Sequence, residues 1–322
     1  MSVAHTPRRL TITVPSSRSG QKVDTLLRKE LHLSGTVIRR IKWLPDGILL
    51  DGDRVFTSAR VSPGQVLSVL VGDNSVTSGI VPTPGVLDIV YEDEDLLTLN
   101  KPAGCSVHPG PGHYSDTLGN FLMYYYESAG ILADFHPVHR LDKGTSGLLV
   151  VAKHPHAQEQ LKNALHTPSF CRTYLAVCDG VPVPASGTVS APIGPAAGSL
   201  VQQQVRPDGK PAVTHYRTLA SFSGRSLMEL TLETGRTHQI RVHMAYLGCP
   251  LTGDFLYGRE DPLLIARPAL HSFRLSFLHP ITGEPLSFTA PPPEDFCALL
   301  PPDVLAAVKD SKSSPSALPR KT

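Results

Sequence analysis

The 322-residue chain lacks the residue patterns on which several protein classes depend. Its five cysteines are odd in number and contain no Cys-x-x-Cys pair, so neither a disulfide framework nor a structural zinc site is expected. The longest apolar runs, such as Leu148–Ala152, are far shorter than the ~18 residues that a membrane span needs. No secretory hydrophobic segment precedes them. We therefore expect a cytoplasmic protein with no membrane partner.

Several catalytic motifs are also missing. The chain has no Gly-x-x-x-x-Gly-Lys-Ser/Thr phosphate loop and no Gly-x-Gly-x-x-Gly loop opening a helix, which leaves nucleotide-driven and nicotinamide chemistry without a site. Gly-x-Ser-x-Gly and His-Glu-x-x-His are absent as well. The 14 histidines include close pairs such as His136 and His139, but carboxylates are not suitably interleaved. We expect neither a metal nor a cofactor; a metal-dependent hydrolase stays as an alternative that EDTA would reveal.

Length and charge indicate two parts of different character. At about 150 residues per domain the chain is long enough for roughly two domains. Residues 1–75 hold 11 Lys and Arg against 6 Asp and Glu, whereas residues 76–322 hold 19 against 22. Such asymmetry indicates either a polyanionic partner for the first part or an ordinary solvated basic face.

The basic part, residues 10–75, has the pattern of a compact unit. Ser34 is a good N-cap for a helix that carries Arg39, Arg40 and Lys42. The other expected elements are a strand at 10–14, a helix at 23–31, a hairpin turning at 51–53 and a closing strand at 66–71. Residues 76–85, which contain Gly, Ser, Thr and Pro, are expected to form a linker.

Residues 86–300 are rich in strand patterns and form the second expected domain. Helices are expected at 157–165 and at 238–247, the latter ended by Gly248. Residues 301–322, rich in Ser, Pro and Lys towards their end, are expected to be a disordered tail. Strands are expected at 86–91, 96–100, 147–153, 173–177, 212–221, 226–233 and 274–278.

Two polar clusters lie in the second part. In His139–Gly147, Asp142 lies between two cations, and a nearby cation keeps a carboxylate ionised for use as a nucleophile or a base. The same pattern also fits a structural turn. In Thr234–His243 a group of donors lies at an expected helix N-terminus, where Arg236 could pair with a carboxylate across a cleft; a capped amphipathic helix explains this stretch equally well.

The first cluster resembles the catalytic motif of the RluA-type pseudouridine synthases. Further blocks agree with that family in the order it shows, and the resemblance covers residues 85–298. These blocks are 100–104 with 107–109, 172–177, 234–242, 248–254 with 257–258, and 270–271 with 279–280. The N-terminal unit is similar, more weakly, to the RNA-binding domain of the ribosomal-protein S-four type, through its helix-helix-hairpin layout and residues 20–24. The resemblance implies an α+β fold: a mixed, mostly antiparallel bisected sheet with flanking helices, after a small α/β RNA-binding module.

The resemblance implies isomerisation of uridine to pseudouridine in RNA without metal or cofactor. Asp142 would be the essential residue, attacking the sugar or the base or removing the ribose 2′ proton, and these routes stay open. Arg236 would match the arginine that pairs with the aspartate. Tyr174 would match the active-site tyrosine, whose ring can stack on the uracil and whose hydroxyl lies where the carbon 5 proton could be removed. Arg140 would match the arginine that fills the space of a flipped-out base.

The expected RNA contacts also include residues outside the catalytic motif. These are Arg39, Arg40 and Lys42 of the N-terminal unit, and Lys101 and His108, which together with His271 fit cleft scaffold or RNA contacts better than catalysis. Large-subunit ribosomal RNA is the first expected substrate and transfer RNA the second. We expect a monomer with no obligate protein partner. The rival from another class is a catalytically idle RNA-binding protein of the same fold.

Overall fold

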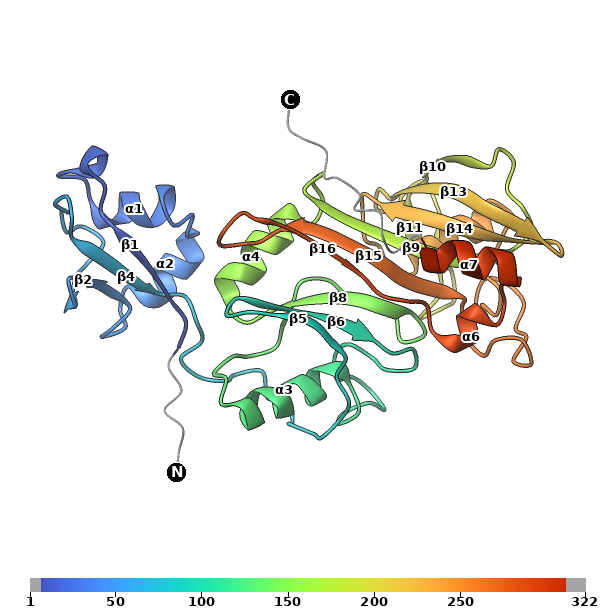
Figure 1. Ribbon diagram of the computed structural model, residues 1–322, viewed down its shortest axis with the longest axis horizontal. Helices are drawn as coiled ribbons and strands as arrows, with labels where there is room; N and C mark the ends of the chain where they lie inside the picture. The colour runs from blue at the N-terminus through green and yellow to red at the C-terminus, as the bar shows by residue number, and fades with distance from the viewer. Residues whose placement is uncertain (1–6, 311–322) are drawn as a thin grey trace.

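The computed structural model describes residues 7–310, and Figure 1 shows a small N-terminal unit beside a larger body. The small unit is a four-stranded antiparallel sheet of order β1-β4-β2-β3 covered by two helices. Ser34 caps the second helix as expected, its hydroxyl accepting from the Val37 amide at 3.3 Å. The elements are β1 Arg9–Thr13, a 3-10 turn Ser16–Arg18, α1 Val23–Lys29, α2 Gly35–Ile41, β2 Ile48–Leu50, β3 Asp53–Arg54 and β4 Val66–Leu70.

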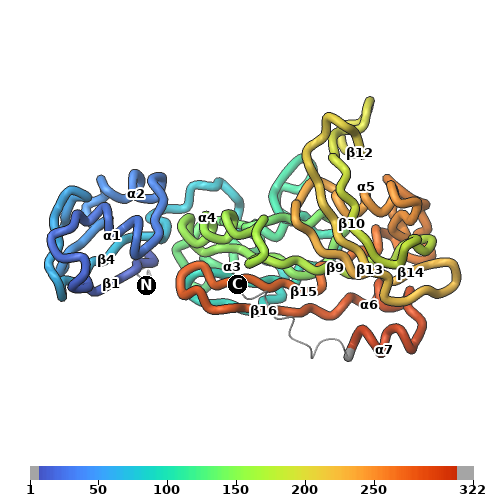
Figure 2. The backbone as a smooth tube through the Cα atoms, turned by 90° about the horizontal axis from the view of Figure 1, so that it is seen from above, coloured from blue at the N-terminus to red at the C-terminus, as the bar shows by residue number. Residues whose placement is uncertain are grey.

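The larger body is built on a ten-stranded sheet. Its main path runs β10-β13-β14-β9-β15-β8-β6-β5, with β16 beside β15 and β7 beside β8. The strands pair antiparallel except β15 with β8. The mixed, mostly antiparallel α+β fold is confirmed. The strands are β5 Ile89–Glu92, β6 Leu96–Lys101, β7 His136–Pro137, β8 Ser146–Ala152, β9 Phe170–Asp179, β10 Ser186–Ser190, β13 Val213–Phe222, β14 Arg225–Leu232, β15 Leu270–Leu278 and β16 Pro285–Thr289. A separate hairpin, β11 Ile193–Pro195 and β12 Gln203–Val205, projects from the body (Figure 2).

Five helices flank this sheet. Two were expected, α4 Pro155–Ala164 and α5 Gln239–Tyr246. The sequence pattern missed α3 Leu118–Ala129, whose Thr117 forms a capping box with Asn120. Its Gly-Asn start and three consecutive tyrosines are weak helix formers, so burial of its Leu and Met side chains decides its conformation.

The expected disordered tail is wrong for residues 302–310. These residues form α7, Pro302–Asp310, after the short helix α6, Glu294–Cys297. Val304, Leu305 and Val308 pack with the buried Phe296 in one hydrophobic cluster, and this apolar contact offsets the entropy of ordering the segment. Residues 311–322 lie outside the described residues.

The parallel contact between β8 and β15 joins the two halves of the sheet. Gly147 lies here with φ +106°, and a Cβ on it would lie 2.3 Å from the Ser272 carbonyl oxygen. Only glycine allows this approach, because other residues avoid that backbone conformation and would clash. The His271 Nδ1 lies 2.9 Å from the Ser146 hydroxyl across the same contact. The loop before β8 is therefore fixed against the strands on either side.

Polar contacts join the N-terminal unit to the larger body. Arg8 Nε donates to Asp95 Oδ1 at 2.8 Å, and the Gln160 side chain donates to the His32 carbonyl at 2.9 Å. His136 Nε2 lies 2.6 Å from Asp73 Oδ2. Among residues 7–310 there is no helix with the length and apolar character needed to traverse a bilayer.

Acid should destabilise the fold through three buried histidines. Burial lowers the pKa of His139 to about 3 and those of His156 and His271 to about 4. The folded state thus keeps them neutral, while the unfolded chain binds protons below about pH 6.5. Their stabilising effect is complete above pH 6.5 and is lost as the pH falls toward 4. His271→Gln removes one of these groups. Between pH 6 and 5, its free energy of unfolding in urea should therefore depend less steeply on pH than that of the wild type, by about one proton or about 1.4 kcal/mol per pH unit. An unchanged slope would contradict this assignment.

Candidate active site

Asp142 lies in the loop before β8, whose backbone is held by three hydrogen bonds. The Thr145 amide donates to the Asp142 carbonyl at 3.0 Å, closing a turn. The next carbonyl, of Lys143, accepts from the Gly104 amide at 2.8 Å, and that of Gly144 accepts from Arg267 Nη1 at 3.1 Å. The Asp142 side chain itself is 24% exposed. The fold therefore fixes the backbone and leaves the carboxylate accessible.

Arg241, not Arg236, lies at ion-pair distance from this carboxylate. Its Nη1 is 4.0 Å from Asp142 Oδ2. Arg236 lines the same pocket, but its Nε donates to the Pro211 carbonyl at 2.9 Å. The expected pairing of Arg236 with Asp142 is wrong, because the turn before α5 directs Arg236 to a backbone carbonyl while the first turn of the helix carries Arg241 to the acid.

A second, buried carboxylate holds Arg241. Its Nε and Nη2 donate to the two oxygens of Asp254, both at 2.7 Å, in a bidentate pair. Asp254 also accepts from the Leu256 and Tyr257 amides. Burial disfavours the charge of Arg241, but the hydrogen bonds and charge of Asp254 outweigh it and raise the pKa of the guanidinium. Arg241 is thus a fixed cation, 5% exposed, beside Asp142.

The start of α5 shows why this arginine points inward. His238 precedes the helix in the left-handed conformation, φ 56°, and its Nδ1 lies 2.8 Å from the Tyr257 hydroxyl. Ile240 and Val242 are both buried on either side of Arg241. The signal that could have found Arg241 is its position between two apolar residues in a short helix, since a charge there needs a buried partner.

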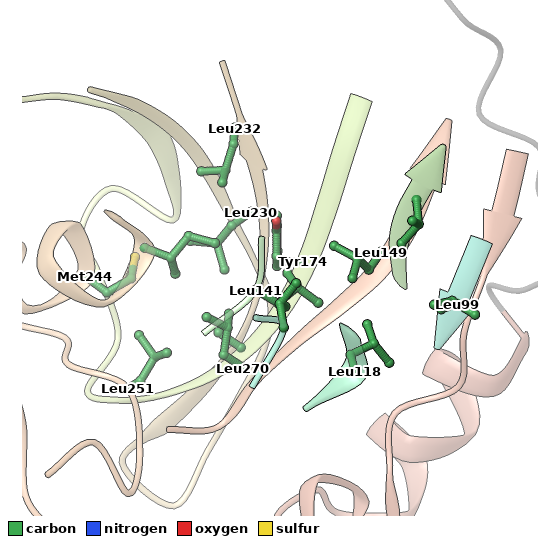
Figure 3. Close-up of a cluster of buried hydrophobic side chains, with 14 of the residues drawn as sticks. Leu99, Leu118, Leu141, Leu149, Tyr174, Leu230, Leu232, Met244, Leu251 and Leu270 are labelled. Atoms are coloured by element: carbon green, nitrogen blue, oxygen red, sulfur yellow. The ribbon is translucent and has the colours of Figure 1, made fainter. Parts of the chain in front are cut away.

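Tyr174 comes from β9 and reaches the same pocket. Its side chain is buried, and Figure 3 places it near Leu141 and Leu270. Asp142, Tyr174 and Arg241 line a pocket of about 280 Å³, near the lower end of ligand-pocket volumes. Burial raises the pKa of the Tyr174 phenol and outweighs the opposing charge of Arg172. A carboxylate, a neutral phenol and a fixed cation thus converge from three separate elements.

Comparison with known proteins assigns this arrangement to a family. A family model described as RNA pseudouridylate synthase matches residues 95–246, which include Asp142, Tyr174 and Arg241. A Bacillus subtilis protein named as an uncharacterized RNA pseudouridine synthase, YlyB, is 42% identical over 90% of this chain and 96% of its own length. The chain belongs to the RluA-type RNA pseudouridine synthase family. Its members are isomerases.

Other relatives agree with this assignment. Ribosomal large subunit pseudouridine synthase D of Vibrio vulnificus is 42% identical, covering 90% of this chain and 93% of the relative. The solved structure of human RNA pseudouridylate synthase domain containing 4 has a TM-score of 0.54 and 27% identity, with 66% of this chain and 91% of that chain covered.

The synthase uses Lys101 as internal scaffold, so its expected RNA contact is wrong. The side chain is 1% exposed, and Nζ donates to the carbonyls of Pro102 and Cys105, both at 2.8 Å. Burial lowers the pKa of Lys101 to about 8. His271 is buried in the same way, between the Ser146 hydroxyl and the Ala290 carbonyl. Both residues stabilise the loops around the site.

Arg140 and His108 differ from these two because they are exposed. Arg140 lies on the wall of the Asp142 pocket. The His108 ring packs edge-on against Phe135 at 5.1 Å. Both therefore stay candidates for RNA contact.

The three basic residues expected on α2 have different roles. Arg39 is exposed. Arg40 is half-buried and donates to the Val71 carbonyl at 2.9 Å, 3.6 Å from Asp73, so it fixes the end of β4 instead of reaching outward. Lys42, one residue after α2, lies over the ring of Trp43. The expected contact by Arg40 is therefore withdrawn.

One cluster in the larger body has the composition of a metal site. Asp93, Asp95 and His279 bring their ligand atoms within 4.8 Å of one another. The carboxylates, however, already accept hydrogen bonds: Asp95 from Arg8, and Asp93 from the Leu96 amide. The geometry is that of a junction between the N-terminal unit and the body.

Exchanging each arginine of the pocket should separate their roles. Arg241→Lys loses the bidentate pair, so the rate of tritium release from RNA labelled at uracil carbon 5 should fall about 100-fold or more at saturating RNA. Arg236→Lys should lower it less than about tenfold. Asp254→Asn should resemble Arg241→Lys, because the guanidinium loses its anchor. Urea unfolding of each variant would separate lost folding from lost rate, and equal effects of the two lysine variants would contradict the assignment.

Proposed function

We propose that this synthase isomerises uridine to pseudouridine in large-subunit ribosomal RNA, with Asp142 as its catalytic residue. The observation that carries the proposal is the accessible carboxylate of Asp142 beside the fixed cation Arg241, in a pocket that also holds the Tyr174 ring. The three residues lie in the segment matched by the family model.

The reaction needs no group beyond the substrate. The bond between uracil and ribose breaks, the base turns, and a bond forms between carbon 5 and the sugar, while the proton of carbon 5 is lost and nitrogen 1 gains one. Asp142 can attack the sugar or the base, or remove the ribose 2′ proton. Each route uses an ionised carboxylate, and Arg241 places a positive charge 4.0 Å from that of Asp142.

Tyr174 supports the orientation of the base. Its pKa is raised, so the phenol is neutral in the resting site and offers an aromatic surface with a hydrogen-bonding tip. Contact between the ring and the uracil is the role that this environment favours. Removal of the carbon 5 proton would need a change in that environment during the reaction.

Arg140 supports access of the base to the pocket. A uridine in a stem must leave the stack before it can reach a carboxylate inside a pocket. The exposed guanidinium of Arg140 on the pocket wall is suited to fill the vacated space or to bind a phosphate there.

The choice of ribosomal RNA rests on the relatives. Proteins named ribosomal large subunit pseudouridine synthase D from Neisseria meningitidis and Vibrio vulnificus are 39% and 42% identical to this chain. The basic N-terminal unit is suited to structured RNA, as an S-four-type domain would be. Transfer RNA is the second candidate substrate.

We further propose that the protein acts as a cytoplasmic monomer.

Asp142→Asn tests the proposal with a substitution of nearly equal size. With RNA labelled at uracil carbon 5, taken from a strain that lacks this gene, the wild type should release tritium and the variant should be slower by at least about 10³-fold. Both should bind the RNA equally in a filter assay. Mapping pseudouridine in the product would name the RNA. EDTA should leave the rate unchanged.

Two results would overturn the proposal. Release of tritium by Asp142→Asn at the wild-type rate would remove Asp142 from the chemistry. Binding without release by the wild type, in RNA shown to hold unmodified target uridines, would favour the idle RNA-binding protein.

A further inference from the structure

The N-terminal unit exposes two aromatic rings side by side, apart from the active-site pocket. Trp43 is 67% exposed and Phe56 is 52% exposed, and their ring centroids are 6.3 Å apart at an interplanar angle of 67°. Trp43 follows the end of α2 and Phe56 follows β3, so two separate elements place the rings together. Large rings left in water bring the fold little burial energy, and such a surface is typical of binding sites.

A cation lies over each ring. Lys42 Nζ is 5.0 Å from the centre of the Trp43 ring, and Arg54 Cζ is 5.3 Å from the centre of the Phe56 ring. Arg54 Nη2 also donates to the Trp43 carbonyl at 3.2 Å, which ties the two elements together. Within residues 7–310, neither cation has a carboxylate within 4.0 Å. Their charges are therefore open to an external anion.

The charge around the rings favours a polyanion. Residues 1–75 carry five more basic than acidic residues. Asp46, three residues after Trp43 in the sequence, lies 3.5 Å from Arg9 and so faces a cation of its own. Asp53 precedes Arg54 on β3. Because successive residues of a strand point to opposite faces, the Asp53 side chain does not share the face of Arg54.

We infer that Trp43, Phe56, Lys42 and Arg54 form a stacking site for an unpaired base of the RNA substrate, distinct from the pocket that holds the reacting uridine. This inference rests on the proposed function for its RNA. An aromatic ring beside a cation matches a nucleotide, which presents a flat base next to a phosphate. The bases of a helical stem are covered by their neighbours, so a loop or bulge is the matching element. A protein partner fits less well, since it would have to neutralise two cations in an otherwise apolar contact.

Trp43 is the only tryptophan in the chain, so its fluorescence reports directly on this site. Titration of the full-length protein with hexaadenylate should quench the emission. An abasic oligonucleotide of the same length, which offers the phosphates without the bases, should leave the emission nearly unchanged at the same degree of binding. Equal quenching by both oligonucleotides, or none by either, would overturn the stacking site.

Substitutions separate stacking from charge through the salt dependence of binding. Trp43→Leu should weaken hexaadenylate binding at least about fivefold at every salt concentration, with an unchanged slope of log K against log salt. Arg54→Gln should instead flatten that slope by about 0.7, the value for one phosphate of a single strand. Trp43→Phe should retain most of the affinity because it keeps a ring. Anisotropy of a labelled oligonucleotide would measure all of these.

Tyr124→Leu is the matched control. It removes a 41% exposed ring from α3, in the larger body, and should leave hexaadenylate affinity unchanged. Urea unfolding would identify a variant that fails to fold, and Trp43→Phe keeps the test valid if Trp43→Leu does so. Affinity equal to wild type in a folded Trp43→Leu would show that the rings serve another partner.

The tritium assay keeps the two hypotheses apart. If the wild type releases tritium but Trp43→Leu binds RNA as tightly as the wild type, the stacking site is wrong and the proposed function stands. If hexaadenylate quenches Trp43 but the wild type releases no tritium, the proposed function is wrong and RNA stacking stands.

Discussion

The buried pair between Arg241 and Asp254 is the interaction on which the site depends. An arginine with only 5% of its side chain exposed loses most of its hydration, so it needs a carboxylate in good geometry. Asp254 supplies two hydrogen bonds of 2.7 Å, and two backbone amides hold Asp254 in turn. The pair leaves Nη1, the third nitrogen of the guanidinium, 4.0 Å from Asp142 Oδ2. A fixed positive charge beside an accessible carboxylate costs no reorganisation when charge moves during a reaction.

The sheet brings the other components to this cation. The parallel contact of β15 with β8 fixes the loop that carries Asp142, and β9 on the other side of β15 carries Tyr174. Gly147 allows the close approach at this contact, and Lys101 and Arg267 donate hydrogen bonds to the loop carbonyls of Lys143 and Gly144. Charged side chains thus have two distinct uses in this region. Some bind backbone carbonyls and hold loops, and a few keep their charge available at the pocket.

The N-terminal unit divides its basic residues in the same way. Arg8 and Arg40 form contacts with Asp95 and with the end of β4, so they contribute to the structure and not to a surface. Lys42 and Arg54 lie over exposed rings with no carboxylate near them in the described part of the chain. Net charge alone does not distinguish these two groups. Only the contacts of each side chain show which charges are available to RNA.

The sequence by itself determined several of the regular elements and the type of chemistry. Ser34 marked the start of α2, the apolar run at 148–152 marked a central strand, and the Asp142 block carried the family resemblance, because these signals are local in the chain. Tertiary structure decided between Arg236 and Arg241, which lie five residues apart in one polar block. The left-handed turn at His238 and the packing of Ile240 and Val242 direct Arg241 inward. Tertiary structure likewise ordered α3 and α7 and buried Lys101. Such outcomes depend on partners distant in the sequence, and the residue pattern of a single segment does not contain them.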